Sequence, residues 1–205
     1  MKINWRNWFS GKKEEQHSYE AHKTLPGKAW HFLAHEDSAL SFIADAIIVV
    51  LLGKFLILPA IGLLLGTGFP LVAVVSSSMD HEGSFDDWWR THGAWYEDQN
   101  FTKEQFAKFS HANGFNKGDV FVVRGTSFED LKVGDVIVYS IPGRPDPIIH
   151  RIVDVETDFV ATKGDANTNQ LNFEVQIFAE QIHGRAVARI PLIGWAKVAF
   201  VDLTQ

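Results

Sequence analysis

Three consecutive serines, Ser76–Ser78, lie directly behind the aliphatic run Leu71–Val75 and are followed by Met79. A serine triplet is usually a solvated turn. A serine hydroxyl becomes a strong nucleophile only when a neighbouring base removes its proton and a third group orients that base. The chemistry open to these serines therefore depends on which titratable residues the fold brings beside them.

His150 is the strongest candidate for such a base. It lies within the apolar stretch "DPIIHRIVDV", between Ile149 and Arg151. A polar side chain in an apolar strand must be hydrogen-bonded or functional, and a satisfied structural histidine is the alternative. Most other histidines occur in polar stretches such as "EEQHSYEAHK", where a solvated role is expected.

Asp165 is the candidate for the group that orients this base. It follows a predicted strand, Phe159–Thr162, in the Gly-Asp turn of "KGDAN". Taken alone, an aspartate in such a turn is a structural residue. A hairpin over residues 148–163 would make two strands antiparallel neighbours and bring His150 near Asp165. Ser78, His150 and Asp165 therefore form a candidate catalytic set.

Short extended segments after residue 68 would position these side chains. They are rich in Val and Ile, and turns containing Gly, Pro or Asp bound most of them. Short strands without intervening helices favour an antiparallel, partly closed β-sheet over a doubly wound one, so the predicted fold class is mainly β. The predicted strands are Leu71–Val75, Val120–Arg124, Val136–Ser140, Ile148–Val155, Phe159–Thr162 and Ile182–Ile190.

The segment 81–116 interrupts this pattern, because it is acidic and dense in aromatic residues. Thr102 and Gln105 resemble a capping box, and Phe106 and Phe109 follow at helical spacing. We therefore predict a small helical insertion in the β domain. Its rings would either cap the β core or dip into a membrane interface, and the sequence leaves both open.

The apolar run Ala46–Gly66 is 21 residues long, close to the roughly 20 residues that a helix needs to cross a bilayer. Lys54 and Pro59 interrupt it, but a membrane helix tolerates both through snorkelling and a kink. The alternative is a buried helix of a soluble domain. We predict three parts: a cytoplasmic or interfacial segment 1–37, a transmembrane anchor 38–68 and an extracytoplasmic β domain 69–205.

The composition excludes several functional classes. The formal charge of the 205 residues is -6 and no basic run occurs, which argues against a nucleic-acid partner. Cysteine is absent, so disulfides, thiolate metal sites and a cysteine nucleophile are excluded. We expect no cofactor and no metal.

Taken together, the motifs resemble the ordered boxes of the type I signal peptidases. They are "SSSM" after the apolar run, "GDV" entering strands, "IIHRIV", "KGDAN" and "ARIPLIGWAKV". They are most similar to the archaeal and endoplasmic-reticulum branch, which uses His where the bacterial enzymes use Lys. The resemblance covers about Leu71–Val201 apart from the insertion. It implies a membrane-anchored serine endopeptidase that removes signal peptides from exported pre-proteins, cutting after small residues.

The same resemblance implies roles for individual residues. Ser78 would be the nucleophile, His150 the general base, and Asp165 matches the acid of the Gly-Asp box. Ser76 and the main-chain N–H of Ser78 would bind the oxyanion. The expected walls of the shallow pockets for small substrate side chains are Val74, Val75, Val136 and Val138.

The implied partners are pre-proteins that carry signal peptides and the lipid bilayer, without nucleic acid. An association with the secretion machinery is a further expectation. The implied location is the cell membrane, with a single span and the catalytic domain on the extracytoplasmic side.

Three positions raise questions within this resemblance. His81 stands where the family usually has a proline, and it offers a second base close to the nucleophile. Leu171 stands where many relatives have a second aspartate, so either Asp165 acts alone or another acid such as Glu174 contributes. Lys163, beside Asp165, is expected to be a charge at the rim of the site.

Two other functions stay open. A non-catalytic, membrane-anchored β domain would bind partners through its aromatic insertion, and changes in the candidate residues would then leave its function intact. A self-cleaving regulatory peptidase of the related repressor type would share the fold. The predicted anchor argues against this last function, as does the lack of a recognisable DNA-binding segment.

Overall fold

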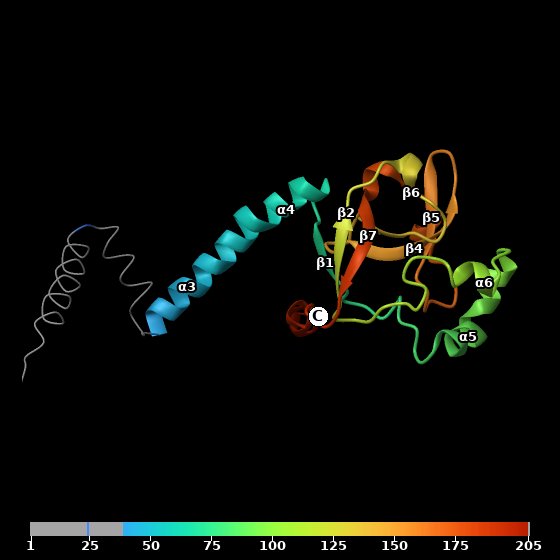
Figure 1. Cartoon of the computed structure of the whole chain (residues 1–205), viewed down its shortest axis with the longest axis horizontal. Helices are drawn as coiled ribbons and strands as arrows, with labels where there is room; N and C mark the ends of the chain where they lie inside the picture. Colours follow the sequence, from blue (N-terminus) through green and yellow to red (C-terminus); the bar gives the residue numbers. More distant parts are fainter. Residues whose placement is uncertain (1–23, 25–38, 205) are drawn as a thin grey trace, which may run out of the picture. The chain divides into compact units, whose positions relative to one another are not determined.

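The computed structural model describes residues 24 and 39–204 (Figure 1). The chain divides into two compact units, residues 1–57 and residues 58–205. The predicted interfacial segment 1–37 lies, apart from residue 24, outside the described residues, and its placement stays a prediction.

The apolar run forms a helix that extends from Ala39 to Leu65, long and apolar enough to cross a membrane. It consists of α3 (Ala39–Leu52), a π-helical stretch η1 (Gly53–Ile57) and α4 (Leu58–Leu65). Pro59 has no N–H to donate, and a local change of helical pitch just before it is a usual way to absorb that loss. Within the described residues, 6% of the most apolar 18-residue stretch of this helix is buried, which favours a membrane span over the core helix of a soluble domain.

A single antiparallel sheet forms the β domain, as predicted (Figure 1). Its seven strands lie in the order β1-β2-β7-β3-β4-β5-β6, so the fourth and fifth strands form a hairpin near one edge. Register shifts between β2 and β7, β3 and β7, and β4 and β5 bend the sheet, which is how a sheet becomes partly closed. The strands are β1 (Leu71–Ala73), β2 (Val120–Arg124), β3 (Val136–Tyr139), β4 (Ile148–Val155), β5 (Phe159–Lys163), β6 (Ile177–Phe178) and β7 (Ile182–Ile190).

All six predicted strands are present, and three of them match to the residue. Neither the two-residue strand β6 nor the closing helix α7 (Trp195–Thr204) was predicted. Three short 3-10 turns complete the domain: η2 (Phe128–Asp130), η3 (Asn172–Glu174) and η4 (Ala179–Gln181).

The predicted insertion consists of α5 (Phe85–Asp98) and α6 (Lys103–Phe106) (Figure 1). The predicted capping box forms, because the Thr102 side chain accepts from the Gln105 N–H and Gln105 accepts from the Thr102 N–H. A second box caps α5 through Ser84 and Asp87.

The rings of the insertion pack against the sheet. Trp88, Tyr96 and Phe106 are at most 1% exposed, and they share an apolar cluster with Val153 of β4 and Ala161 of β5. Of the two roles that the sequence left open, these rings therefore cap the β core, and buried rings are not available to a membrane.

We expect Phe106→Ala to lower the free energy of unfolding by about 3–5 kcal/mol, because it leaves a cavity between the insertion and the sheet. Phe178→Ala serves as the control, since Phe178 is 40% exposed. Thermal or urea unfolding in detergent, followed by circular dichroism, measures both losses. Equal losses in the two variants would contradict the packing of the insertion on the sheet.

Candidate active site

Ser78 lies in a tight turn just beyond β1. Before the turn, Val74 accepts from the Gly118 N–H at 2.9 Å and donates its own N–H to the Asp119 carbonyl at 2.8 Å, both in the loop before β2. Within the turn, the Asp80 N–H donates to the Ser77 carbonyl at 3.1 Å. Met79 is 1% exposed and anchors the turn in the core. With Met79 fixed inside, the preceding Ser78 is left only half-buried.

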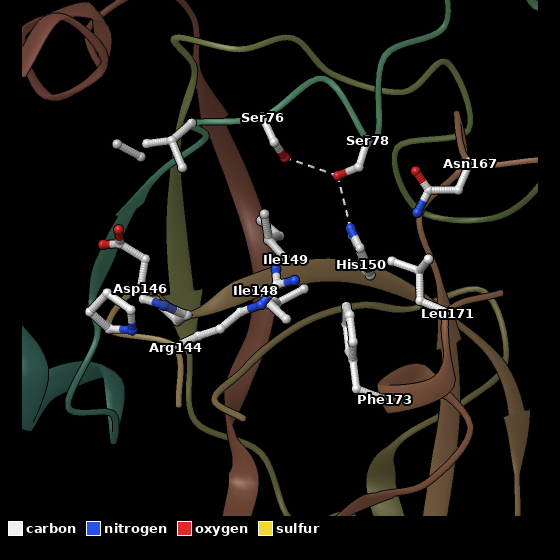
Figure 2. Close-up of a pocket in the computed structure, with 14 residues that line it drawn as sticks. Ser76, Ser78, Arg144, Asp146, Ile148, Ile149, His150, Asn167, Leu171 and Phe173 are labelled. Atoms are coloured by element: carbon white, nitrogen blue, oxygen red, sulfur yellow. Dashed lines mark hydrogen bonds between the residues drawn. The ribbon is translucent and has the colours of Figure 1, made fainter. Parts of the chain in front are cut away.

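His150 presents its ring to this serine. It lies on β4 opposite Ile137 of β3, in the part of the strand that is buried on both faces. Its Nε2 is 2.8 Å from the Ser78 Oγ, across 72 residues of sequence, as Figure 2 shows. The structure therefore brings together the predicted nucleophile and the predicted base.

The acid on the other side of the ring is Glu174. Its Oε1 is 2.5 Å from His150 Nδ1, and its side chain is fully buried. The N–H groups of Gly164 and Leu171 also donate to this carboxylate, at 3.0 and 2.6 Å. A carboxylate accepts only, so Nδ1 carries the proton and Nε2 is free to accept from the Ser78 hydroxyl.

Asp165 lies close by but serves other groups, which corrects the expected pairing with His150. Its carboxylate accepts from Arg151 at 2.7–3.2 Å, from Tyr96 Oη at 3.0 Å and from His81 Nε2 at 3.0 Å. Successive residues of a strand point to opposite faces, so Arg151, and not His150, meets the side chain of Asp165. Of the acids that the sequence left open, Glu174 is the one that reaches the imidazole.

Burial alone would raise the pKa of Asp165, but the Arg151 guanidinium and the hydrogen bonds from His81 and Arg151 hold it well below its usual range. Tyr96 stays a hydrogen-bond donor, because burial and the charge of Asp165 raise its pKa well above the usual value. His81 is engaged on Nε2 and stacks on Trp88 with ring centroids 3.7 Å apart. The His81 ring is thus held by Asp165 and Trp88, and these contacts do not place it at Ser78 as a second base.

Lys163 was expected at the rim, and the structure places it fully inside. Its Nζ donates to the carbonyls of Gly164 and Asn167, at 3.1 and 2.6 Å. Burial lowers the pKa of Lys163 to about 8, although the charges of Asp165 and Glu174 oppose this. The prediction failed because aromatic rings from the insertion cover the ammonium group.

Ser76 lies beside the candidate nucleophile, with its Oγ 3.0 Å from the Ser78 Oγ (Figure 2). An adjacent hydroxyl in this position is available to a negatively charged oxygen that develops near Ser78. Its role as an oxyanion donor stays a prediction.

A cavity of about 370 Å³ opens beside Ser78 and His150. Of the four predicted wall residues, Val75 lines it, whereas Val74, Val136 and Val138 face the main core cluster. For Val136 and Val138 the prediction failed because every residue of β3 is buried, so alternation along the strand does not identify the side that faces the cavity. The lining is completed by Ala73, Ser76, Arg144, Pro145, Asp146, Pro147, Ile148, Ile149, Asn167, Leu171 and Phe173.

Much of this lining was missed by sequence reasoning. The proline-rich loop "SIPGRPDP" between β3 and β4 supplies one wall, and Leu171 and Phe173 near η3 supply another (Figure 2). The signal that could have found the first wall is the position of this loop directly before the strand of His150.

The Asp165–Arg151 pair gives a prediction on stability and pH. Asp165→Asn should lower the free energy of unfolding at pH 7 by about 3–5 kcal/mol, because it leaves the buried guanidinium without a counter-charge. The folded-state pKa of Asp165 is depressed, so its stabilisation is present above the unfolded-state value of about 4 and is lost as the pH falls below it.

Urea unfolding in detergent at pH 7 and pH 3 measures this difference, which should shrink at the lower pH. Asp146→Asn is the matched control, because Asp146 and its partner Lys197 are both exposed and such a pair contributes at most about 1 kcal/mol. A loss for Asp165→Asn no larger than the control would overturn the account of this pair.

No family model matches the chain. It is similar to proteins named signal peptidase complex catalytic subunit from Sclerotinia sclerotiorum, with 31% identity over 100 residues, and from Lodderomyces elongisporus, with 39% identity over 97 residues. A subunit of the same name, SEC11C, from Canis lupus familiaris is 28% identical over 99 residues.

These alignments cover 41–43% of this chain and 51–56% of the three relatives, so the chain spans just over half the length of the curated relatives that it matches. The similarity agrees with the motifs in the sequence. The predicted resemblance to the type I signal peptidases, in the branch that includes those of the endoplasmic reticulum, is therefore confirmed.

Proposed function

We propose that this protein is a membrane-bound serine endopeptidase that removes signal peptides from exported pre-proteins. The observation that carries the proposal is the unbroken hydrogen-bonded series Ser78–His150–Glu174 at the edge of a cavity. Three groups in this order are what an activated serine requires. The similarity to signal peptidase catalytic subunits supports the substrate class.

In the proposed mechanism, His150 Nε2 takes the proton of the Ser78 hydroxyl as its oxygen attacks the carbonyl carbon of the scissile peptide. Glu174 holds the Nδ1–H and stabilises the imidazolium that forms. The imidazolium then gives its proton to the leaving amine, and an acyl-enzyme remains. Water, deprotonated by the same ring, hydrolyses the ester and restores Ser78.

The oxyanion would be bound by the main-chain N–H of Ser78 together with the Ser76 hydroxyl, which already lies 3.0 Å from the reacting oxygen. One such donor is typically worth about 10²–10³ in rate. Because Ser76 comes from the same turn, a single backbone conformation sets both groups.

An extended peptide fits beside β1. Among the described residues, this strand is at the edge of the sheet and pairs with β2 alone, so one of its two edges has no strand partner there. Ala73, the last residue of β1, and Val75, just beyond the strand, line the cavity. We propose that the pre-protein adds to this edge by main-chain hydrogen bonds, while the cavity accepts the small side chains before the cleaved bond.

The helix Ala39–Leu65 supports a membrane location, since its length and composition suit a single span. We propose that it anchors the chain in the cell membrane with the β domain on the extracytoplasmic side. A signal peptide is itself held in the bilayer. An anchored enzyme therefore finds the cleavage site of the signal peptide by diffusion within the membrane plane. An association with secretion machinery is part of the same proposal.

The aromatic insertion does not favour the alternative of a non-catalytic binding module. Such a module would present its rings to a partner, whereas Trp88, Tyr96 and Phe106 are enclosed against the sheet. Peptidase activity is therefore the better account of Ser78 and His150.

Ser78→Ala and His150→Ala should each reduce cleavage of a pre-protein by a factor on the order of 10⁴ or more, because either change removes the activated nucleophile. The assay uses detergent-solubilised full chain, and circular dichroism checks that each variant is folded. Ser77→Ala is the matched control, since Ser77 is in the same triplet and is exposed. Cleavage at the wild-type rate by Ser78→Ala would refute the proposal.

Glu174→Gln should lower kcat by about 10²–10⁴, because an amide no longer fixes the Nδ1–H tautomer of His150 or stabilises its charged form. Steady-state kinetics with a signal-peptide substrate measures kcat and KM separately, and KM should change little. Cleavage by Glu174→Gln with a kcat equal to that of wild type would show that the assignment of Glu174 is wrong.

A further inference from the structure

The insertion of α5 and α6 has no part in the chemistry proposed above, yet several of its polar contacts reach one segment of the chain. That segment is the turn of residues 163–167, called here the Gly-Asp turn. It links β5 to the segment that carries Glu174, and it contacts each member of the proposed catalytic series.

The contacts of the Gly-Asp turn with the site are made by its main chain. The Ala166 N–H donates to the Ser78 carbonyl at 2.8 Å, and the Gly164 N–H donates to the Glu174 Oε1 at 3.0 Å. A Cβ at Gly164 would lie 3.0 Å from both the His150 Nε2 and the Ser78 carbonyl oxygen. The conformation of this turn therefore sets how the serine, the base and the acid lie relative to one another.

The insertion holds the turn from the opposite side through Asp165. The Tyr96 hydroxyl, on α5, donates to Oδ1 at 3.0 Å, and His81, just before α5, donates to Oδ2 at 3.0 Å. His81 is itself held by its stack on Trp88. Arg151 also joins Asp165 to the insertion. Its guanidinium donates to Asp165 and to the main-chain carbonyls of Ser110 and His111 at the end of the insertion.

Lys163 adds a second attachment. Its ammonium group lies 5.1 Å from the ring centroid of Trp95 and 4.9 Å from that of Tyr96, within the range of cation–π attraction. The same group donates to the carbonyls of Gly164 and Asn167, and so closes the turn on itself. Two charged side chains of the turn, Asp165 and Lys163, thus end on the same helix.

We propose that the insertion is a positioning element for the catalytic centre, in which Tyr96 and His81 act through Asp165 to hold the Gly-Asp turn against Ser78, His150 and Glu174. This inference rests on the proposed function. Neither residue touches the substrate or the reacting atoms, so both are positioning residues. His81, which stands where the family usually has a proline, thus helps to attach the insertion to the Gly-Asp turn.

The first test compares two variants of the full chain in detergent. Tyr96→Phe removes one hydroxyl but keeps the ring against Lys163, and kcat should fall about three- to tenfold with KM unchanged, as expected for one buried hydrogen bond. Ser84→Ala weakens the cap of α5 without contacting Asp165, and its kcat should equal that of wild type well below its unfolding temperature. Equal kcat for Tyr96→Phe and wild type would overturn the proposal, as would an equal fall in both variants.

The second test does not depend on activity. Hydrogen exchange of the Ala166 and Gly164 amides should be accelerated about two- to tenfold in Tyr96→Phe and unchanged in Ser84→Ala, because a loosened turn opens more often. Unchanged exchange in Tyr96→Phe refutes the positioning role. A wild-type chain that cleaves no pre-protein refutes the proposed function, while the exchange result still decides whether the insertion holds the turn.

A double-mutant cycle separates action through Asp165 from a general loss of stability. If Tyr96 acts through Asp165, then adding Tyr96→Phe to Asp165→Asn should lower kcat by less than Tyr96→Phe does alone. Additive effects would contradict this route. Should Asp165→Asn fail to fold, the exchange measurement on Tyr96→Phe remains decisive.

Discussion

The buried carboxylate of Asp165 is the interaction on which the site and its surroundings depend. An ionised carboxylate with no exposed surface is strongly unfavourable unless a counter-charge and hydrogen bonds surround it. Arg151 supplies the charge, and Tyr96 and His81 complete the shell. Because Arg151 follows His150 on β4 and Asp165 follows β5, this one ion pair fixes two strands, a turn and the insertion together.

His150 and Arg151 are neighbours on β4, and their side chains lie on opposite faces of the sheet. His150 points to the cavity, where Glu174 holds its far nitrogen, and Arg151 points to the insertion, where Asp165 holds its guanidinium. Each basic side chain thus has its own carboxylate. A glutamate can take the place next to His150 because its longer side chain reaches the ring from η3, where two main-chain N–H groups fix its direction.

Strand positions were predictable because they depend on local patterns, namely apolar runs that end at Gly-Asp or proline-containing turns. The Ser78–His150 contact was predicted from the resemblance, and the structure forms it. The choice between Asp165 and Glu174 was not predictable, since it depends on which face of β4 each carboxylate reaches. The burial of Lys163 was not predicted for a similar reason. The rings that enclose its ammonium group come from a distant segment, and no local sequence pattern indicates such burial.

The order of these residues along the chain has a consequence for when the site can exist. Ser78 precedes the insertion, whereas His150, Asp165 and Glu174 all lie in the last third of the sequence. During synthesis Ser78 therefore emerges long before His150, and its hydroxyl is then an ordinary alcohol in a partly folded chain. Ser78 meets His150 and Glu174 in their hydrogen-bonded series only when the segment through η3 has folded onto the sheet.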